Sequence, residues 1–362
     1  MSLLKKLLKW SGLLIGVLLI IFIAFLIIPE PVDVLPITPR ESTRYWDMKE
    51  GFRLAYTHLP GDPAGAAPIV FLHGGPGGYV HSSIIETMAE ISTLGHDVYL
   101  YDQRGSGLSD RMPRYSDISF DKHLQDLHEV ITEKIGARQV ILMGQSFGSI
   151  LIAHYSARYP DHVAGLIFSS PGTLLPHRRV KGQYADLDSL YPAPDTLQFR
   201  NPYDFVDDVN LTAAKPKAIV ATLGALLLDK KLISDEQMDQ VLNNLAAKFT
   251  RGMVCDPANV LPEEGGGGLY AYLATNQVNQ PEIRRALQNV QAPALILQGQ
   301  CEHIPFSAAY EYAALYPRSR YEMIENAGHE IWWEEPDKYI GLIREFLTQH
   351  RPGTAGGAPG KD

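Results

Sequence analysis

After about residue 46, short apolar runs alternate along this chain with amphipathic segments. The apolar runs are APIVFLHG, HDVYLYDQ, RQVILMGQ, VAGLIFSS, APALILQG and SRYEMIEN. Runs this short and continuous are typical of parallel strands buried on both faces. Between two of them, SFDKHLQDLHEVITEKIGA repeats apolar residues at steps of three and four, which predicts a helix with one apolar face. The strand–helix–strand order predicts an α/β fold with a mostly parallel central sheet flanked by helices.

The alternation is interrupted between residues 173 and 290, where AAKPKAIVATLGALLLDKKL and SDEQMDQVLNNLAAKF predict helices. We therefore expect a helical insertion at 173–290 between two parts of an α/β core, 46–172 and 291–350. The consecutive glycines 265–268 predict a hinge or a loop within the insertion. The tail, 351–362, is expected to be disordered.

The first 28 residues differ in character from the rest of the chain. An uncharged stretch from Trp10 to Ile28 would form a helix of roughly 28 Å, close to the thickness of the hydrocarbon core of a bilayer. A cleaved signal peptide would have a shorter apolar run followed by a small-x-small site. Residues 1–28 therefore predict an uncleaved N-terminal transmembrane helix that anchors the protein in a membrane.

The residues on either side of this helix predict its orientation. Lys5, Lys6 and Lys9 precede it, whereas its other flank carries charges of both signs. The positive-inside bias places the N-terminus in the cytoplasm and the remaining chain on the periplasmic or extracellular side. Four prolines in residues 29–45 predict an extended linker to the folded domain.

Composition limits the partners and cofactors of the chain. Its formal net charge is −9, without a long Lys/Arg run, which argues against nucleic acid as a partner. The only cysteines, Cys255 and Cys301, match no metal-ligand spacing, so no zinc site is predicted. The sequence is compatible with a disulfide between them and equally with two free thiols.

The segment GQSFG, residues 144–148, joins the predicted strand RQVILM to the predicted helix SILIAHYSARYP. A serine between two glycines at such a junction is typical of a nucleophile elbow, whose sharp turn raises the serine hydroxyl above the edge of the sheet. The alternative is a glycine-containing turn with an incidental serine, and the strand–helix context favours the elbow. Ser146 is the candidate nucleophile.

A serine hydroxyl is a weak nucleophile at neutral pH and needs a base, which a third group must orient. His329 follows the last predicted strand, SRYEMI, in a glycine-containing loop. That loop would deliver its side chain to the same sheet edge as Ser146. His329 is therefore the candidate base, and His303 is the rival.

The acid of such a triad precedes the histidine along the chain and follows the strand before the histidine strand. Glu302, in GQCEHIPF, occupies that place, and Asp337 and Glu330 are the fallback acids. Because glutamate is one methylene longer than aspartate, Glu302 requires a loop that lies slightly farther back.

Acyl transfer also needs hydrogen-bond donors for the developing oxyanion. Phe147 offers a backbone N–H directly after the nucleophile, and Gly75 offers another in FLHGGPGG. Glycine lets the backbone approach a substrate oxygen closely. The alternative for the HGGPG segment is a simple turn.

The motifs HGGPGG, YDQRGSGLSD, GQSFGS, GQCEHIPF and NAGH, in this order, resemble those of the α/β-hydrolase superfamily, and most closely the proline iminopeptidases. The resemblance implies an α/β-hydrolase fold in which the helical insertion is a cap over the site. It implies that Asp102 and Arg104 form a structural turn braced by charge pairing. Its implied catalytic triad and oxyanion hole are Ser146, Glu302, His329, Gly75 and Phe147.

Some features differ from the usual proline iminopeptidase pattern. Gln145 and Phe147 flank the serine, a glutamate takes the acid position, and the insertion contains no tryptophan. In that family a carboxylate of the cap binds the free amine of the substrate. Glu263 and Glu264 are candidates for this role, and the alternative is that they belong to a solvated surface.

The combined expectation is a serine hydrolase that transfers an acyl group to water through Ser146, without a metal or organic cofactor. The first substrate hypothesis is a small peptide with an N-terminal proline or similar residue. The second is a carboxylic ester. A membrane-tethered binding protein that kept the fold but lost catalysis is the alternative from another class.

Overall fold

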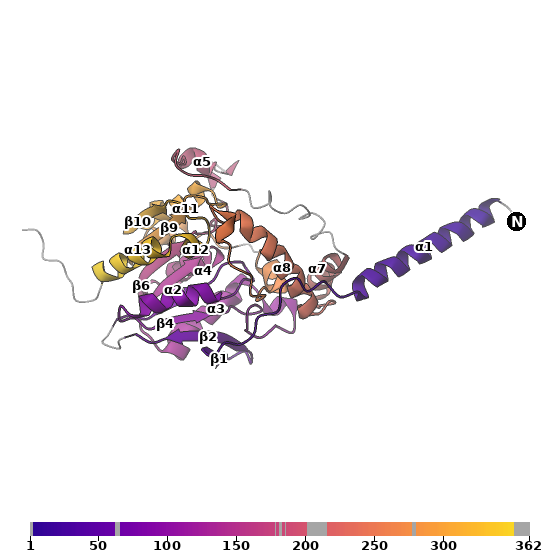
Figure 1. The fold of residues 1–362 in the computed structure, drawn as a ribbon, viewed down its shortest axis with the longest axis horizontal. Coiled ribbons are helices and arrows are strands. Elements are labelled where there is room, and N and C mark those ends of the chain that lie inside the picture. Colours follow the sequence, from indigo (N-terminus) through magenta and orange to yellow (C-terminus); the bar gives the residue numbers. More distant parts are fainter. Residues whose placement is uncertain are drawn as a thin grey trace, which may run out of the picture.

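The computed structural model describes residues 3–61, 66–177, 179–180, 183–184, 186–200, 216–276 and 280–350. The tail at 351–362, expected to be disordered, lies outside the described residues. Figure 1 shows a folded domain of sheet and helices from which one long helix projects.

An eight-stranded sheet forms the centre of the domain, in the order β1-β2-β4-β3-β5-β6-β9-β10. The strands from β4 to β10 in this order are parallel, whereas β1 pairs antiparallel with β2 and β2 antiparallel with β4. The prediction of a mostly parallel sheet is confirmed, and the six predicted apolar runs contain its six parallel strands. The bounds are β1 Thr43–Asp47, β2 Arg53–Leu59, β3 Ile69–Leu72, β4 Val98–Tyr101, β5 Val140–Gln145, β6 Val163–Ser169, β9 Ala294–Gly299 and β10 Ser319–Ile324.

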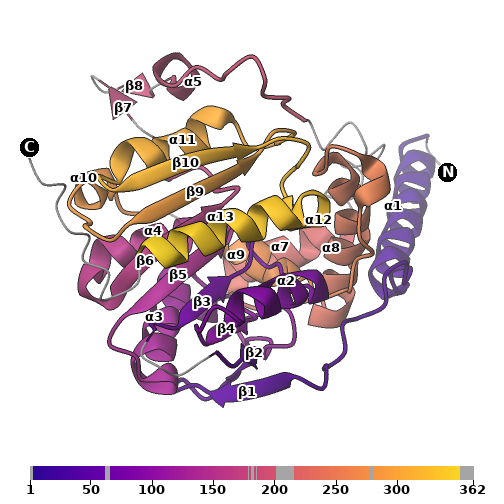
Figure 2. The same ribbon diagram turned by 60° about the vertical axis from the view of Figure 1, so that its left-hand side comes forward.

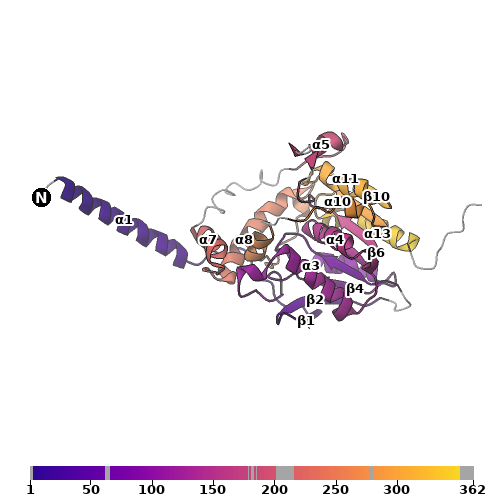
Figure 3. The same cartoon turned by 180° about the vertical axis from the view of Figure 1, so that it is seen from behind.

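Helices cover both faces of the sheet, as predicted. α2 (Ser82–Ser92) and α13 (Pro336–Gln349) cross one face in Figure 2, where their apolar residues share a buried cluster with β3, β4 and β9. α3 (Phe120–Glu129), α4 (Phe147–Arg158) and α11 (Phe306–Leu315) cover the other face, seen from behind in Figure 3. The predicted helix around residues 119–137 is α3 continued by a π-helical turn, Val130–Ile135.

The insertion divides into parts that lie at different places on the sheet. α7 (Pro216–Leu228), α8 (Asp235–Phe249) and α9 (Leu269–Asn276) form a helical group near the carboxyl ends of the parallel strands. The short pair β7 (Arg179–Val180) and β8 (Gln183–Tyr184) and the helix α5 (Leu187–Leu190) lie beside α11 instead. The remaining short elements are α10 Arg284–Leu287, α12 Ile331–Glu334 and 3₁₀ turns at Tyr115–Asp117, Pro160–His162, Thr250–Gly252 and Pro257–Asn259.

The glycine run 265–268 is a loop that is packed tightly, and nothing in its packing resembles a hinge. All four glycines are buried. A Cβ atom on Gly266 would lie 2.4 Å from the Tyr79 ring, and one on Gly268 would lie 2.2 Å from the carbonyl oxygen of Gly105. These glycines are needed for close packing against the core.

The N-terminal helix α1 (Leu3–Ile27) projects from the domain (Figures 1 and 3). Its segment Lys9–Leu26 has a mean hydropathy of 2.3, is unburied, and is long and apolar enough to cross a membrane.

The residues that follow α1 lie against the helical group and do not form a free spacer. Gln240 and Asn244 of α8 donate side-chain hydrogen bonds to the carbonyl oxygens of Val34 and Pro31. The backbone N–H of Ile37 donates to Gly265, and residues 43–45 are already part of β1. The linker predicted at 29–45 is therefore extended but packed.

Candidate active site

Ser146 stands in the sharp turn between β5 and α4, with φ 52° and ψ −115°. Neither flanking glycine has room for a side chain, as the elbow requires. A Cβ on Gly144 would lie 2.5 Å from the backbone of Gly148, and one on Gly148 would lie 2.2 Å from the carbonyl oxygen of Leu72. The strained backbone leaves the Ser146 side chain partly exposed among buried neighbours.

His329 and Glu302 form a buried pair at the same edge of the sheet. Nδ1 of His329 lies 2.8 Å from Oε1 of Glu302 and donates a hydrogen bond to that carboxylate. Two further donors hold the same oxygen, the backbone N–H groups of His303 (2.8 Å) and Ile304 (3.1 Å). The backbone N–H of His329 donates to the carbonyl oxygen of Met253 at 2.7 Å. These bonds fix the ring so that Nε2 is the nitrogen left for a proton transfer.

Burial and charge set the protonation states of this pair. Burial lowers the pKa of His329 below its ordinary value, although the carboxylate of Glu302 raises it. Burial alone would raise the pKa of Glu302, but the charge of His329 and hydrogen bonds from His303 and His329 hold it well below its usual range. Near neutral pH the site therefore contains a neutral imidazole beside a carboxylate, the combination a general base requires.

Ser146 and His329 line one cavity of about 490 Å³. The Ser146 hydroxyl makes no hydrogen bond to any residue that the structure describes, so it is available to a ligand. In enzymes without bound substrate, the hydrogen bond between the nucleophile and its base is often long and tightens only when substrate binds.

His303, the rival base, lies between Glu302 and the cavity. Its Nδ1 is 3.1 Å from Oε1 of Glu302, and its ring packs edge-on against His329. The ligand atoms of Glu302, His303 and His329 lie within 4.8 Å of one another, a spacing that a metal ion could use. Oε1 of Glu302 accepts hydrogen bonds from His329, His303 and Ile304, whereas Oε2 of Glu302 and Nδ1 of His303 have no hydrogen-bond partner among the described residues.

The two fallback acids, Asp337 and Glu330, have different surroundings from Glu302. Asp337 is exposed in the first turn of α13. Glu330 faces the cavity, where its Oε1 accepts a hydrogen bond from Gln145 at 3.3 Å. The acid paired with His329 is thus Glu302.

The HGGPG loop borders the same cavity with Gly75, whose φ is 123°. The buried side chain of His73 supports this loop through hydrogen bonds. The N–H of Gln103 donates to Nε2 of His73 at 2.9 Å, so the proton of the ring is on Nδ1, which donates to the carbonyl oxygen of Gly74 at 2.8 Å. Burial lowers the pKa of His73 to about 4, which keeps this ring neutral.

Phe147 is the first residue of α4, and its backbone N–H has no acceptor within the helix. Its side chain is buried against Phe120 and His123 on the far side of the turn. The Phe147 side chain therefore anchors the elbow while its N–H remains at the start of the helix, beside Ser146.

Asp102 and Arg104 brace their turn through partners in other parts of the chain. Asp102 accepts backbone N–H bonds from Val80 and Leu108, both at 2.7 Å. Arg104 forms a two-pronged ion pair with Asp126 and contacts Glu50 as well. The charge pairing that braces this turn comes from α3 and from the loop after β1.

The walls of the cavity come from α7, α8 and α9 and from the core helix α12. Most of these side chains are apolar, and Trp332 and Trp333 are the largest. The insertion holds no tryptophan, as its sequence indicates, but these two tryptophans directly after the catalytic loop reach the cavity from the core. The sequence feature that could have indicated them is the segment IWW, residues 331–333, shortly after His329.

Two carboxyl groups line the cavity, those of Glu263 and Glu330. Glu263 accepts a hydrogen bond from the Tyr79 hydroxyl at 2.8 Å, whereas Glu264 turns away to Arg40 of the linker and the backbone of Ser82. Only Glu263 of the two predicted candidates therefore lines the cavity.

These carboxyl groups are perturbed by their surroundings. Burial raises the pKa of Glu263, although the hydrogen bond from Tyr79 opposes this. Burial raises the pKa of Glu330 to about 8, and the nearby charges of Glu263 and Glu302 act in the same direction. Glu330, the residue after His329, was considered in the sequence only as a fallback acid.

Cys255 and Cys301 form a disulfide with a Cα–Cα distance of 5.1 Å. It joins the loop after α8 to the residue that precedes Glu302. The same loop provides Met253, which accepts the backbone hydrogen bond of His329. The disulfide therefore connects the helical group to the loop of Glu302, and the Met253 hydrogen bond connects it to the loop of His329.

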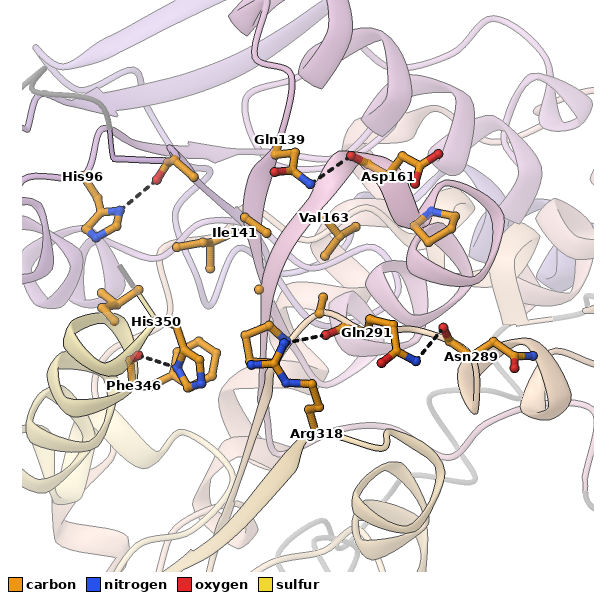
Figure 4. A pocket seen from close by; sticks show the side chains of 17 residues that line it. His96, Gln139, Ile141, Asp161, Val163, Asn289, Gln291, Arg318, Phe346 and His350 are labelled. Atoms are coloured by element: carbon orange, nitrogen blue, oxygen red, sulfur yellow. Dashed lines mark hydrogen bonds between the residues drawn. The ribbon is translucent and has the colours of Figure 1, made fainter. Parts of the chain in front are cut away.

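A second cavity, of about 520 Å³, lies at the opposite edge of the sheet (Figure 4). In it His96, Gln139 and Arg318 donate side-chain hydrogen bonds to backbone carbonyl oxygens. This cavity is at the amino ends of the parallel strands, whereas ligands of open α/β sheets bind beyond the carboxyl ends. Ser146 and His329 both belong to the first cavity.

Comparisons with known proteins agree with this geometry. The family described as alpha/beta hydrolase fold matches residues 67–336. The chain is 27% identical over 288 residues to a protein named proline iminopeptidase from Saccharolobus solfataricus, covering 78% of this chain and 84% of that protein. A proline iminopeptidase of Heyndrickxia coagulans is 25% identical, with coverages of 78% and 91%.

Solved structures show the same fold at lower identity. A proline iminopeptidase of Mycobacterium smegmatis superposes with a TM-score of 0.54 at 19% identity, covering 85% of this chain and 98% of that chain. A putative aryl esterase from Burkholderia cenocepacia gives a TM-score of 0.53 at 19% identity with the same coverages.

Proposed function

The chain belongs to the alpha/beta hydrolase fold family, and from this premise we propose that it is a membrane-anchored serine hydrolase with the triad Ser146, His329 and Glu302. The observation that carries the proposal is geometric. A serine on a strained strand–helix turn opens onto the same cavity as a buried histidine, whose other nitrogen is hydrogen-bonded to a carboxylate.

In the proposed mechanism Nε2 of His329 takes the proton of the Ser146 hydroxyl as Oγ attacks the carbonyl carbon of the substrate. The backbone N–H groups of Gly75 and Phe147 donate to the oxyanion that forms. His329 then gives its proton to the leaving group, and an acyl-enzyme remains. Water, deprotonated by the same ring, releases the acid product and restores Ser146.

The favoured substrate is a peptide from which a single N-terminal residue, such as proline, is released. The relatives named proline iminopeptidase support this, and so does the chemistry of the cavity. The Glu263 carboxylate would attract the free ammonium group of the substrate. Glu330, held largely protonated near neutral pH by its raised pKa, adds a hydrogen-bonding group without a second full charge.

The second candidate function is the hydrolysis of a carboxylic ester. It is favoured by the mainly apolar wall of the cavity, with Trp332 and Trp333 at its side, and by structural relatives described as esterases. The same triad would perform the same acyl transfer, so the two candidates differ in the group bound beyond the carbonyl. A binding protein without catalysis is the remaining alternative.

Three variants of the full chain, purified in detergent, separate these possibilities: Ser146→Ala, Glu263→Gln and Glu264→Gln. We expect Ser146→Ala to abolish both activity and labelling by a fluorophosphonate probe, which reports an activated serine. Wild type without probe labelling would favour the binding protein, and Ser146→Ala with an unchanged rate would remove Ser146 from the mechanism.

Glu263→Gln tests the substrate class. If the enzyme is an aminopeptidase, this variant should raise KM for proline p-nitroanilide at least about tenfold, because it removes a charge-assisted contact worth roughly 1.5–3 kcal/mol. Hydrolysis of p-nitrophenyl acetate, which has no amine, should change little. The matched control is Glu264→Gln, whose side chain does not line the cavity.

We also propose that α1 is a single-pass anchor with its N-terminus in the cytoplasm and the catalytic domain outside it. The apolar length of α1, the preceding lysines and the disulfide support this topology, because disulfides persist in oxidising compartments. Protease added to intact cells or spheroplasts should degrade the domain. A domain protected until the membrane is permeabilised would contradict the orientation.

A further inference from the structure

One face of the helix α7 is apolar and exposed although the helix belongs to a folded domain. Ile219, Leu223, Leu226 and Leu227 recur at steps of four, three and one residues, which puts them on one side of the helix. Their exposed fractions are 46, 50, 48 and 74%. A continuous aliphatic surface of this kind marks an interaction site.

The other sides of α7 are already occupied. Lys217, Ala221, Gly224 and Ala225 are buried against the domain. Ala218 and Thr222 line the active-site cavity. The helix is therefore fixed in place, while the side chains of its aliphatic face remain 46 to 74% exposed.

The position of α7 next to α1 identifies what covers that face. Figures 1 and 3 both place α7 where α1 joins the domain, and the two helices are in contact. The Lys217 ammonium group donates to the carbonyl oxygen of Ile28, the first residue after α1, and lies 3.8 Å from Glu30. A bilayer spanned by α1 would therefore end at the level of α7.

We propose that α7 is an interfacial helix, whose aliphatic face lies among the lipid head groups and upper acyl chains of the membrane that α1 spans. Its 13 residues give about 20 Å of helix, too short to cross a bilayer but suited to lying on one. The exposed side chain of Ile28 makes the apolar surface of α1 continuous with the region of α7. This inference rests on the proposed anchoring by α1.

The placement has a consequence for the substrate. One side of α7 would face lipid and an adjacent side faces the cavity, so only the thickness of one helix would separate the membrane from the cavity. Amphiphilic peptides or esters that partition into the bilayer would then be concentrated beside the cavity.

Spin labels test this inference in the full chain reconstituted into phosphatidylcholine–phosphatidylglycerol vesicles. The chain has two cysteines, both in the disulfide, so Leu227→Cys introduces one reactive thiol. Collision of the label with oxygen, which concentrates in lipid, is compared with collision with a water-soluble nickel complex. Two control variants are labelled in the same way: Ile20→Cys within α1 and Gln349→Cys at the far end of α13.

We expect the oxygen-to-nickel collision ratio at position 227 to be several-fold higher than at position 349 and to approach the ratio at position 20. A ratio at 227 equal to that at 349, with lipid exposure at 20, would overturn the interfacial position of α7 and leave the anchor intact. A label at 227 shielded from both reagents would overturn it in favour of a protein contact. Water exposure at position 20 would refute the anchor itself, and with it this inference.

Discussion

Replacing Glu302 by glutamine tests the proposed triad most directly. The substitution Glu302→Gln keeps the size of the side chain and an oxygen that can accept from the backbone N–H groups of His303 and Ile304. It removes the negative charge that faces His329. The fold should therefore persist while the protonated ring, which forms in the transition state, loses its counter-charge.

The expected loss follows from the geometry of the pair. Nδ1 of His329 and Oε1 of Glu302 are 2.8 Å apart, so the delocalised charges of the imidazolium and carboxylate are roughly 4 Å apart. At an effective dielectric constant of about 20, their attraction is about 4 kcal/mol, or a factor of about 10³ in rate. Because the retained oxygen also accepts from Nδ1 of His329, the tautomer is kept and the expected fall in kcat is about 10³.

The assay is hydrolysis of p-nitrophenyl acetate, or of proline p-nitroanilide if that is the substrate, with thermal unfolding measured on the same samples. Glu325→Gln is the matched control, because it makes the same change at an exposed residue of the loop before His329 and should leave kcat unchanged. If folded Glu302→Gln enzyme kept more than about a tenth of the wild-type kcat, the assignment of the acid would be wrong.

Three further predictions concern packing, pH and the disulfide. Gly268→Ala should destabilise the protein by about 1–3 kcal/mol in urea unfolding, whereas Gly341→Ala, whose Cβ would meet no atom within 4 Å, should stabilise α13 by roughly 0.5–1 kcal/mol. Because the base must be neutral and burial lowers the pKa of His329, kcat/KM should fall on the acid side only below about pH 6.5. Reduction of the disulfide, or Cys255→Ser, should cost about 4 kcal/mol of stability, since the bond closes a loop with a sequence separation of 46 residues.

Each of these has a clear contrary result. Equal effects of the two alanine substitutions would mean that the packing at Gly268 is not tight. A fall of kcat/KM that begins above the ordinary pKa of histidine would mean that a group with a raised pKa controls catalysis. This would contradict the lowered pKa of His329. Unchanged unfolding in reductant would mean that the disulfide does not constrain the unfolded chain.

The parallel strands β3, β4, β5, β6 and β9 could be predicted because their apolar runs are continuous and nearly all of their residues are buried. β10, at the parallel edge of the sheet, is only partly buried. β1 and β2 were not predicted, because strands at the antiparallel edge alternate between buried and exposed residues and carry charges such as Arg53. Hydrophobic continuity therefore identifies the buried inner parallel strands, and the mixed burial of β1 and β2 gives no such signal.

The roles of Ser146, Glu302 and His329 could be proposed from the sequence because each follows a strand, and topology carries the ends of parallel strands to one edge. The environment of the cavity could not be predicted from the sequence. Glu263 and Glu264 are neighbouring glutamates, and the sequence does not distinguish them. In the fold, Glu263 lines the cavity, whereas Glu264 contacts Arg40. The disulfide also depended on tertiary packing, since it joins loops from the insertion and the core.

We propose that this disulfide helps Glu302 to serve as the acid of the proposed triad. A longer side chain reaches the same point on the histidine only if its backbone is held farther back. Cys301, directly before Glu302, is bonded to Cys255, and the carbonyl oxygen of Glu302 accepts a hydrogen bond from the backbone N–H of Arg200 at 2.8 Å. Both contacts come from the insertion, which in the proposed triad would therefore set the distance between Glu302 and His329. We therefore expect substitutions that loosen the insertion to affect kcat as well as substrate binding.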